Sequence, residues 1–360
     1  MDNLIKFNSI LNNFEINKSS IVLSSAPKNI GIGAHFFCNA KCIFCLGGKY
    51  SPFSIDRYKM FFEEKLKDIL IKAENVDFHG FGELLLMPDI NSFIKRINKT
   101  LPEQRKTFFT NGINLKNKNF DDGRFNIIIS LHASNAKLHK NIVGVDGFEE
   151  IISNIKELKK QKNIKITLYS VITKINLDDM CDFVRLGAKL KVDAITFRYL
   201  TIFDYKDFDL TVYMYKNQTN ENINKSLELA KKLGIYINVP QMFSDTGIKQ
   251  IKKTCRCPWD YTYIENQGTV NACVFAGKHI GNLTDSNFKD VWNSLKYQKL
   301  RKELLTGQPN DICKKCIEYN SNNINKISAH ITFRPLTYNK MLKYITDNRK
   351  RYGLSLKDIL

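Results

Sequence analysis

The sequence contains no long apolar run. No segment approaches the roughly 18 consecutive apolar residues that a membrane-spanning helix needs. Residues 1–14 carry Asn, Lys and Asp in place of the continuous apolar stretch of a secretory signal. The chain also has no internal repeat and no low-complexity linker. These absences predict a cytoplasmic globular protein without a membrane partner, in a compartment where thiols stay reduced and disulfides are rare.

Acidic residues are also in short supply. The 360 residues include 36 Asp and Glu against 55 Lys and Arg, which gives a formal net charge of +19. A charge of this sign is typical of proteins that bind nucleic acids or anionic ligands. The basic residues recur along predicted helices, as at Lys156, Lys159 and Lys160, and do not form one patch with interleaved aromatic residues. This distribution disfavours nucleic acid and favours a nucleotide, a sugar phosphate or a peptide as substrate.

Short apolar runs alternate with amphipathic segments between about residues 28 and 205. The expected strands are Ile30–Phe37, Asn75–His79, Lys106–Thr110, Asn126–Leu131, Ile164–Ile172 and Ala194–Leu200. The expected helices are Phe61–Ala73, Ile90–Asn98, Phe148–Lys160, Leu177–Leu190 (capped by Asn176), Glu221–Leu233, Phe288–Leu305 and Lys340–Tyr352. This alternation predicts an α/β protein of βαβ units, with a parallel sheet that is either open or closed into a barrel.

The nine cysteines are clustered. Three lie in residues 38–45, five lie between Cys255 and Cys316, and Cys181 stands alone. In a reducing compartment such clustering indicates metal or iron–sulfur ligation. Cys181, on the apolar face of a predicted helix, is more typical of a buried filler than of a hydrogen-atom donor.

The first cluster has the spacing Cys38-x3-Cys42-x2-Cys45 and directly follows the first predicted strand. A cubane iron–sulfur cluster has four irons, so three thiolates leave one iron open to an external ligand. The alternative is a zinc site whose fourth ligand is His35 or His79. With Phe44 before the last cysteine and Asn39 after the first, the loop resembles that of the radical SAM superfamily.

This resemblance extends to the ends of the later strands. The second strand runs into His79-Gly80-Phe81-Gly82-Glu83, similar to the "GGE" motif that holds the amino group of S-adenosylmethionine, although Phe81 interrupts the glycines. Thr110-Asn111-Gly112 after the third strand is also frequent in the superfamily. The resemblance implies cofactor-binding roles for Phe44, Gly80, Gly82, Glu83, Ser130, Val171 and Arg198, on a partial (β/α)6 TIM-like barrel whose site lies at the carboxyl ends of the strands.

The second cysteine group combines Cys257-x10-Gly268-x4-Cys273 with Cys313-Lys-Lys-Cys316. Zinc ribbons use similar pairs, but the spacing resembles the SPASM and Twitch iron–sulfur domains appended to radical SAM barrels. The resemblance implies a second 4Fe–4S cluster on Cys257, Cys273, Cys313 and Cys316, with Cys255 as an alternative to Cys257. The expected parts are thus an N-terminal extension (1–27), the barrel (28–240), the small Fe–S domain (241–325) and a basic tail helix (326–360).

The expected function is that of a radical SAM oxidoreductase. It would cleave S-adenosylmethionine on the first 4Fe–4S cluster, with electrons from a flavodoxin or ferredoxin, and dehydrogenate a sugar, an aminocyclitol or a peptide residue. The alternatives are an epimerase with a cysteine hydrogen donor, an RNA-modifying enzyme, and a zinc-binding structural or nucleic-acid-binding protein. A molybdenum-cofactor cyclase is disfavoured, because it would show another three-cysteine pattern and a Gly-Gly C-terminus, whereas this chain ends Lys357-Asp-Ile-Leu360.

Overall fold

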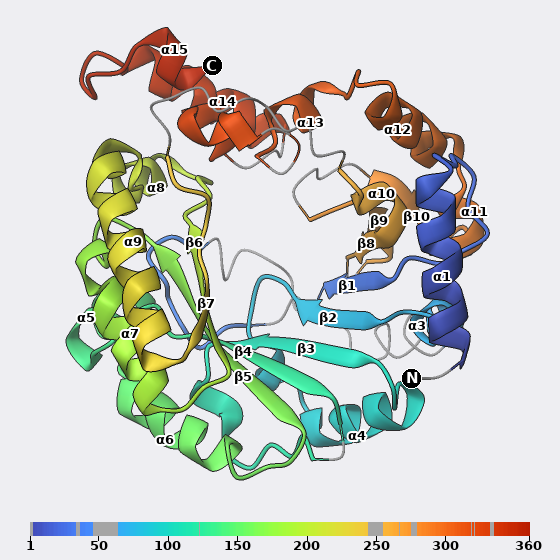
Figure 1. Cartoon of the computed structure of the whole chain (residues 1–360), viewed down its shortest axis with the longest axis horizontal. Helices are drawn as coiled ribbons and strands as arrows, with labels where there is room; N and C mark the ends of the chain where they lie inside the picture. Colours follow the sequence, from blue (N-terminus) through green and yellow to red (C-terminus); the bar gives the residue numbers. More distant parts are fainter. Residues whose placement is uncertain are drawn as a thin grey trace.

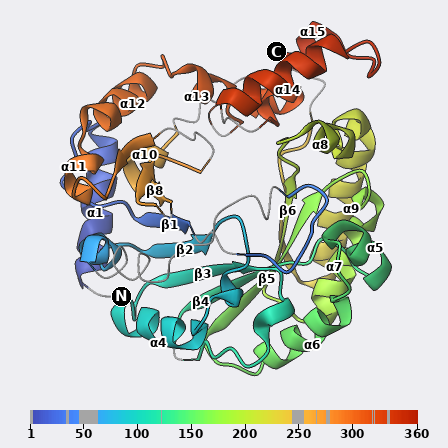
Figure 2. The same ribbon diagram turned by 180° about the vertical axis from the view of Figure 1, so that it is seen from behind.

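The computed structural model describes residues 3–33, 37–45, 64–121, 123–243, 255–265, 267–274, 279–317, 319, 321–331 and 335–360. Its strands form one ten-stranded sheet in the order β10-β9-β8-β1-β2-β3-β4-β5-β6-β7. Figure 1 shows helices around the outside of this curved sheet, and the C-terminal helices across the opening between its two edges. Figure 2 shows the same ring-like arrangement from behind.

Six parallel strands form the centre of the sheet, as predicted. They are β1 (Asn29–Gly33), β2 (Asn75–His79), β3 (Arg105–Thr110), β4 (Phe125–Ser130), β5 (Ile164–Ile172) and β6 (Ala194–Tyr199). A seventh parallel strand that was not predicted, β7 (Tyr236–Asn238), pairs with β6. The predicted first strand was too long: β1 ends at Gly33, residues 34–36 (with His35) lie outside the described residues, and Phe37 is not in a strand.

The small C-terminal part joins the same sheet. Strand β8 (Tyr261–Ile264) pairs in parallel with β1, and β9 (Thr269–Asn271) and β10 (His279–Asn282) continue in antiparallel order. The boundary expected near residue 240 therefore lies between two strands of one continuous sheet. Because β8 occupies the free edge of β1, the second cysteine group is placed beside the first strands of the barrel.

The helices cover the outer face of the sheet and its open side. They are α1 (Asn3–Asn17), α3 (Lys67–Leu70), α4 (Ile90–Thr100), α5 (Ala136–Val143), α6 (Phe148–Leu158), α7 (Met180–Lys189), α8 (Tyr205–Leu210), α9 (Lys216–Leu233), α10 (Cys257–Asp260), α11 (Phe288–Trp292), α12 (Leu295–Leu305), α13 (Asp311–Lys315), α14 (Pro335–Asp347) and α15 (Leu356–Ile359). In the described part of the chain, no helix is long and apolar enough to cross a bilayer.

Several predicted helix boundaries are wrong for local reasons. The helix expected over Phe288–Leu305 is two helices, because the side chain of Asn293 bonds both main-chain groups of Leu23 and Ser294 starts a new helix as its cap. Asn176 does not cap α7; its side chain bonds strand ends, and residues 177–179 form a 3-10 turn.

The other two differences concern helix length. Residues 61–63 of the helix expected over Phe61–Ala73 lie outside the described residues, and α3 ends at Leu70 because the chain turns so that Glu74 N donates to Lys28 O. The tail helix expected over Lys340–Tyr352 begins earlier, at Pro335, a residue suited to the first helical position. It ends at Asp347, after which Arg351 N donates to Asn348 O in a turn.

Each central strand has an outer face under the helices and a concave face toward the middle of the ring. On the outer face, the Phe78 ring lies 5.9 Å from that of Phe93 in α4, and the Phe197 ring lies 5.6 Å from that of Phe183 in α7. Side chains alternate between the two faces of a strand. His79, Phe109, Tyr169 and Arg198 therefore belong to the concave face, and we use that term for it below.

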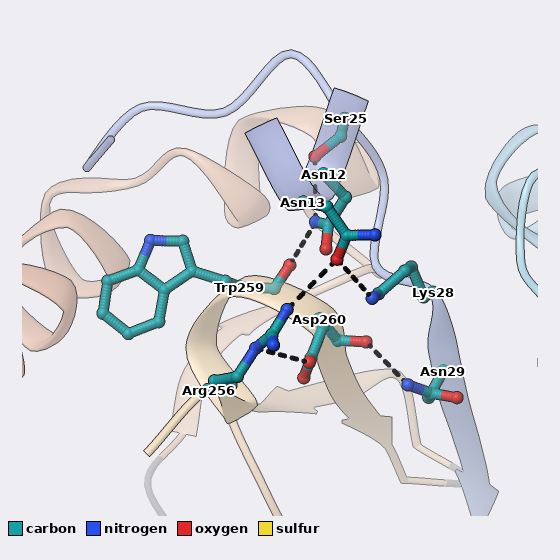
Figure 3. Close-up of polar contacts among 8 residues, drawn as sticks. All are labelled: Asn12, Asn13, Ser25, Lys28, Asn29, Arg256, Trp259 and Asp260. Atoms are coloured by element: carbon teal, nitrogen blue, oxygen red, sulfur yellow. Dashed lines mark hydrogen bonds and ion pairs between the residues drawn. The ribbon is translucent and has the colours of Figure 1, made fainter. Parts of the chain in front are cut away.

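The N-terminal helix α1 connects the barrel to the small C-terminal part, which contains α10 and β8–β10, through buried polar groups. Asn12 Nδ2 donates to Trp259 O at 2.7 Å and to Ser25 Oγ at 3.0 Å (Figure 3). Asn29, the first residue of β1, donates to Asp260 O at 3.3 Å. Because Trp259 and Asp260 follow Cys257 on α10, these bonds set the position of that helix against the barrel.

Candidate active site

The first cysteine loop is held over the end of α5. Lys41 N donates to Val143 O at 2.9 Å, and Ile43 N donates to Ile142 O at 3.0 Å. Gly144 ends α5 with φ +75°, and a Cβ there would lie 2.7 Å from Lys41 O. The loop therefore requires glycine at this position, both for the left-handed backbone and for the close approach.

The three thiols of this loop influence one another. Burial, together with the negative charges of the Cys45 and Cys38 thiolates, raises the pKa of Cys42 to about 12. Burial also raises the pKa of Cys38, with contributions from Glu83 and Cys45. Repulsion among gathered thiolates is what bound iron would relieve, so this donor set fits a cationic cluster.

The described residues contain no three His, Cys, Asp or Glu side chains placed to share a single metal ion.

The glycine-rich segment after β2 leads to a buried carboxylate. Gly80 is exposed, Gly82 has φ +130°, and Glu83 is only 1% exposed. Glu83 Oε1 accepts from Leu85 N at 3.0 Å, and Oε2 accepts from Asn111 N at 2.6 Å. Burial raises the pKa of Glu83, and these N–H donors counteract the rise. The Thr110 side chain also hydrogen-bonds Glu83, so three donors surround this carboxylate.

The next strand ends lie side by side. In the sheet register Ser130 faces Tyr169, and Val171 faces Arg198. Ser130, Val171 and Arg198 are all half-buried. The structure thus brings three of the predicted cofactor-binding residues to neighbouring positions at the carboxyl ends of β4, β5 and β6.

A histidine links these strand ends to the cysteine loop. His132 has φ +63°, and its Nδ1 accepts from Val171 N at 3.1 Å. Its ring lies 5.3 Å from that of Phe44, edge to face. Burial lowers the pKa of His132 to about 3, so the ring is neutral and free to accept this bond. Asn176 supports the same region by donating to His132 O and Val171 O, each at 2.9 Å.

The auxiliary cysteines come from two parts of the small domain. Cys257 begins α10 and Cys273 follows β9. A hydrogen bond with Cys255 raises the pKa of Cys257, as do burial and the charges of Cys255 and Cys273, so these three thiols face one another. The choice between Cys255 and Cys257 as ligand therefore stays open.

The other pair of auxiliary cysteines lies on α13. Cys313 is inside this helix and Cys316 is its C-terminal cap. Asn310 Nδ2 donates to Cys313 Sγ at 3.4 Å, and Asn323 Nδ2 donates to Cys316 O at 3.2 Å. The ninth cysteine, Cys181, contacts Ser226 Oγ at 3.7 Å between α7 and α9, in the outer helical layer. Cys181 is therefore remote from the concave face.

A row of rings on the concave face joins the two cysteine regions, and sequence reasoning missed it. The rings of His79 and Tyr263 are stacked at 4.9 Å, His79 lies 5.6 Å from Phe109, and Phe109 lies 6.3 Å from Tyr169. Tyr169 in turn lies 6.3 Å from His132. The alternation of side chains within each strand shows which rings share a face of the sheet. It does not show that β8 pairs with β1, and that pairing is what brings Tyr263 to His79.

Comparison with known proteins agrees with this geometry. The model of the radical SAM superfamily matches residues 34–187, and that of the SPASM iron–sulfur cluster-binding domain matches residues 255–317. A curated GTP 3′,8-cyclase of Aquifex aeolicus is 27% identical over 322 residues, which cover 78% of this chain and 94% of that protein. A probable GTP 3′,8-cyclase of Saccharolobus islandicus is 28% identical over 169 residues, which cover 44% and 52%.

Solved structures are similar in fold. The structure of anSMEcpe with bound AdoMet is 16% identical, with a TM-score of 0.61, and the match covers 92% of this chain and 97% of that one. Streptococcus suis SuiB bound to its precursor peptide SuiA is 16% identical, with a TM-score of 0.59 and coverage of 82% and 70%. At this identity the likeness concerns the fold alone, and it confirms the predicted partial barrel with a C-terminal domain.

Proposed function

Because the chain belongs to the radical SAM superfamily and carries a C-terminal SPASM domain, we propose that Cys38, Cys42 and Cys45 hold the 4Fe–4S cluster that binds S-adenosylmethionine. The observation that carries this proposal is the convergence of these coupled thiols with the buried Glu83 at the mouth of the barrel. When bound, the cofactor and its cluster supply a 5′-deoxyadenosyl radical that removes a hydrogen atom from the substrate, and a second cluster supplies an electron acceptor.

The strand ends offer a group for each part of the cofactor. Glu83 accepts from its ammonium group, and the exposed Gly80 and the half-buried Gly82 let the backbone approach it. Ser130 donates to its ribose or carboxylate, and Arg198 pairs with its carboxylate. Val171 packs against the adenine.

The remaining cofactor-binding assignment is Phe44, which closes the loop side of this site. Its support is the edge-to-face contact with His132, which in turn binds the end of β5. This contact supports the assignment, because it joins the cysteine loop, to which Phe44 belongs, to the strand ends assigned to the cofactor.

We assign the substrate to the concave face, between the two cysteine regions. Dehydrogenation of a sugar, an aminocyclitol or a peptide removes one hydrogen atom, then one electron and one proton. Asp77 is a candidate acceptor for that proton, because it lies on the concave face of β2. Burial raises the pKa of Tyr261, and the charge of the nearby Asp77 adds to the rise. The charges of Cys257 and Cys273 also contribute to the raised pKa of Tyr261, so Asp77 and the auxiliary cysteines lie near the same tyrosine.

The test is cofactor cleavage by anaerobically reconstituted protein. With S-adenosylmethionine and dithionite, the wild type is expected to release 5′-deoxyadenosine, and Cys42→Ala is expected to abolish the release. Cys181→Ala is the matched control, since that thiol lies in the outer helical layer. Cleavage retained by Cys42→Ala, or zinc without inorganic sulfide in protein purified without oxygen, would refute the proposal.

Cyclisation of a nucleotide is the second candidate. It is favoured by the Aquifex relative, whose sequence is matched over 94% of its length. The stacked His79 and Tyr263 rings also offer a planar surface suited to a base. The cysteine spacing and the last residues of the chain disfavour a cyclase, whereas the Aquifex and Saccharolobus relatives favour one. Mass spectrometry of the product separates the two reactions, because dehydrogenation removes two hydrogens whereas cyclisation within one molecule keeps the mass.

A further inference from the structure

The turn Thr110-Asn111-Gly112 after β3 contains an asparagine whose side-chain amide and main-chain N–H all form hydrogen bonds. Asn111 is 8% exposed. Its Nδ2 donates to Cys38 Sγ at 3.8 Å and to Asn39 Oδ1 at 2.7 Å. Its Oδ1 accepts from Ile113 N at 3.0 Å, and its main-chain N donates to Glu83 Oε2 at 2.6 Å. Asn111 is therefore the point where the cysteine loop, the carboxylate and the end of β3 meet.

The orientation of this amide follows from its partners. The main-chain N–H of Ile113 is a donor only, so the side-chain atom of Asn111 that faces it must be the oxygen. The NH₂ group then faces the sulfur of Cys38. An amide turned the other way would place two acceptors against each other at Asn39 Oδ1.

The turn itself is anchored on both sides. Asn154 of α6 donates to Gly112 O and to Ile113 O, each at 3.0 Å. On the loop side, Asn39 Nδ2 donates to Asn114 Oδ1 at 2.7 Å. The side-chain amides of Asn39, Asn111 and Asn114 thus connect the cysteine loop to a turn that is fixed on α6. This connection keeps Asn111 Nδ2 directed at the sulfur of Cys38.

An N–H donor directed at a cluster sulfur changes the redox properties of the cluster. Reduction adds negative charge, part of which resides on the ligand sulfurs, so the donor stabilises the reduced form more than the oxidised form. Hydrogen bonds to the sulfurs are among the determinants of cluster potential. We propose that Asn111 is a positioning residue that orients Cys38 and raises the reduction potential of the cluster at the first cysteine loop. This inference rests on the proposed function, which assigns that cluster to Cys38, Cys42 and Cys45.

The test is an anaerobic redox titration of the reconstituted full chain, followed by electron paramagnetic resonance. Asn111→Leu keeps a similar volume and retains the main-chain bond to Glu83, but it lacks the side-chain donor. We expect a tenfold shift of the equilibrium toward the oxidised cluster, which is about 59 mV for a one-electron couple. The second cluster of the same sample is the internal reference, and its potential is expected to stay unchanged.

Asn114→Ala is the matched control, since it removes the far end of the amide chain and leaves the bond from Asn111 to Cys38 in place. Its shift is expected to be less than half that of Asn111→Leu. An unchanged potential in Asn111→Leu overturns the inference, and so does an equal shift of both clusters, which would indicate a general structural effect.

A second variant decides the case in which Asn111→Leu assembles no cluster. Asn39→Ala removes the acceptor that orients the Asn111 amide and leaves the Asn111 side chain present. A lowered potential in Asn39→Ala supports the inference, and the wild-type potential contradicts it. The proposed function fails separately, if the wild-type cluster signal does not respond to S-adenosylmethionine.

Discussion

Asn12 is the residue whose replacement best tests how the N-terminal helix holds the small Fe–S part. Its side chain is fully buried, at 0% exposure, and both hydrogen bonds donated by its Nδ2 cross from α1 to other segments. One of them reaches Trp259 O on α10, two residues after Cys257. We therefore consider the substitution Asn12→Ala.

The expected loss of stability can be worked out from these two bonds. Removing Asn12 Nδ2 leaves Trp259 O buried without this donor, which costs about 1–3 kcal/mol. The bond to Ser25 Oγ contributes about 1 kcal/mol more; Ser25 keeps its other partner, because its hydroxyl also donates to Glu15 Oε2 at 2.6 Å. Asn12 Oδ1 is buried without a hydrogen-bond partner among the described residues, so its removal offsets about 1 kcal/mol of this loss. The free energy of unfolding is thus expected to fall by about 1–3 kcal/mol.

Tryptophan fluorescence during urea denaturation is a specific assay for this contact. The chain contains two tryptophans, and both bind the N-terminal segment. Trp259 Nε1 donates to Ser20 O at 2.7 Å, and Trp292 Nε1 donates to Ser25 O at 2.9 Å. The fluorescence transition therefore reports on the joint between α1 and the small domain, and far-UV circular dichroism reports on the whole chain.

The neighbouring Asn13 provides the control. It is exposed, and its Oδ1 accepts from Lys28 Nζ at 3.0 Å and from Arg256 Nη2 at 3.1 Å (Figure 3). Surface bonds of this kind are worth little, so Asn13→Ala is expected to change stability by less than about 0.5 kcal/mol. The same fluorescence midpoint for Asn12→Ala and Asn13→Ala would refute the reasoning.

Two further predictions concern the first site and the response to pH. Gly144→Ala is expected to lower the iron and sulfide content of the first site, because the added Cβ displaces Lys41. Gly234→Ala is the control: Gly234 also has a positive φ, +66°, but no atom lies within 4 Å of the added Cβ, so both contents are expected to stay unchanged. Iron and sulfide analysis of the two variants tests this prediction. Burial lowers the pKa of His132 to about 3 and that of His330 to about 4, against an ordinary value of 6.5 in the unfolded chain. The free energy of unfolding is therefore highest above pH 6.5 and decreases as the pH falls below that value. At pH 5 each buried imidazole is expected to cost about 2 kcal/mol; a melting temperature that is constant between pH 7 and 5 would contradict this.

Several properties of the protein were determined by the sequence alone. The six central strands follow from short apolar runs, which are local signals. The cysteine spacings likewise define two ligand groups before any fold is known, since ligands a few residues apart on one loop are necessarily close in space. The family and the partial barrel, which the comparisons confirm, were inferred from these local patterns.

Other properties were decided only by the tertiary structure. His79 and Tyr263 stack because β8 pairs with β1, and no local periodicity specifies which strand occupies the edge of a sheet. Asn12 belongs to the segment expected only as an N-terminal extension, yet it lies in a helix and is buried because α10 packs against it. Asn111 reads as a turn residue, and its role at Cys38 depends on where the cysteine loop lies. The physical reason is common to all three: contacts between distant segments depend on strand order and helix docking, which follow from the energy of the whole chain.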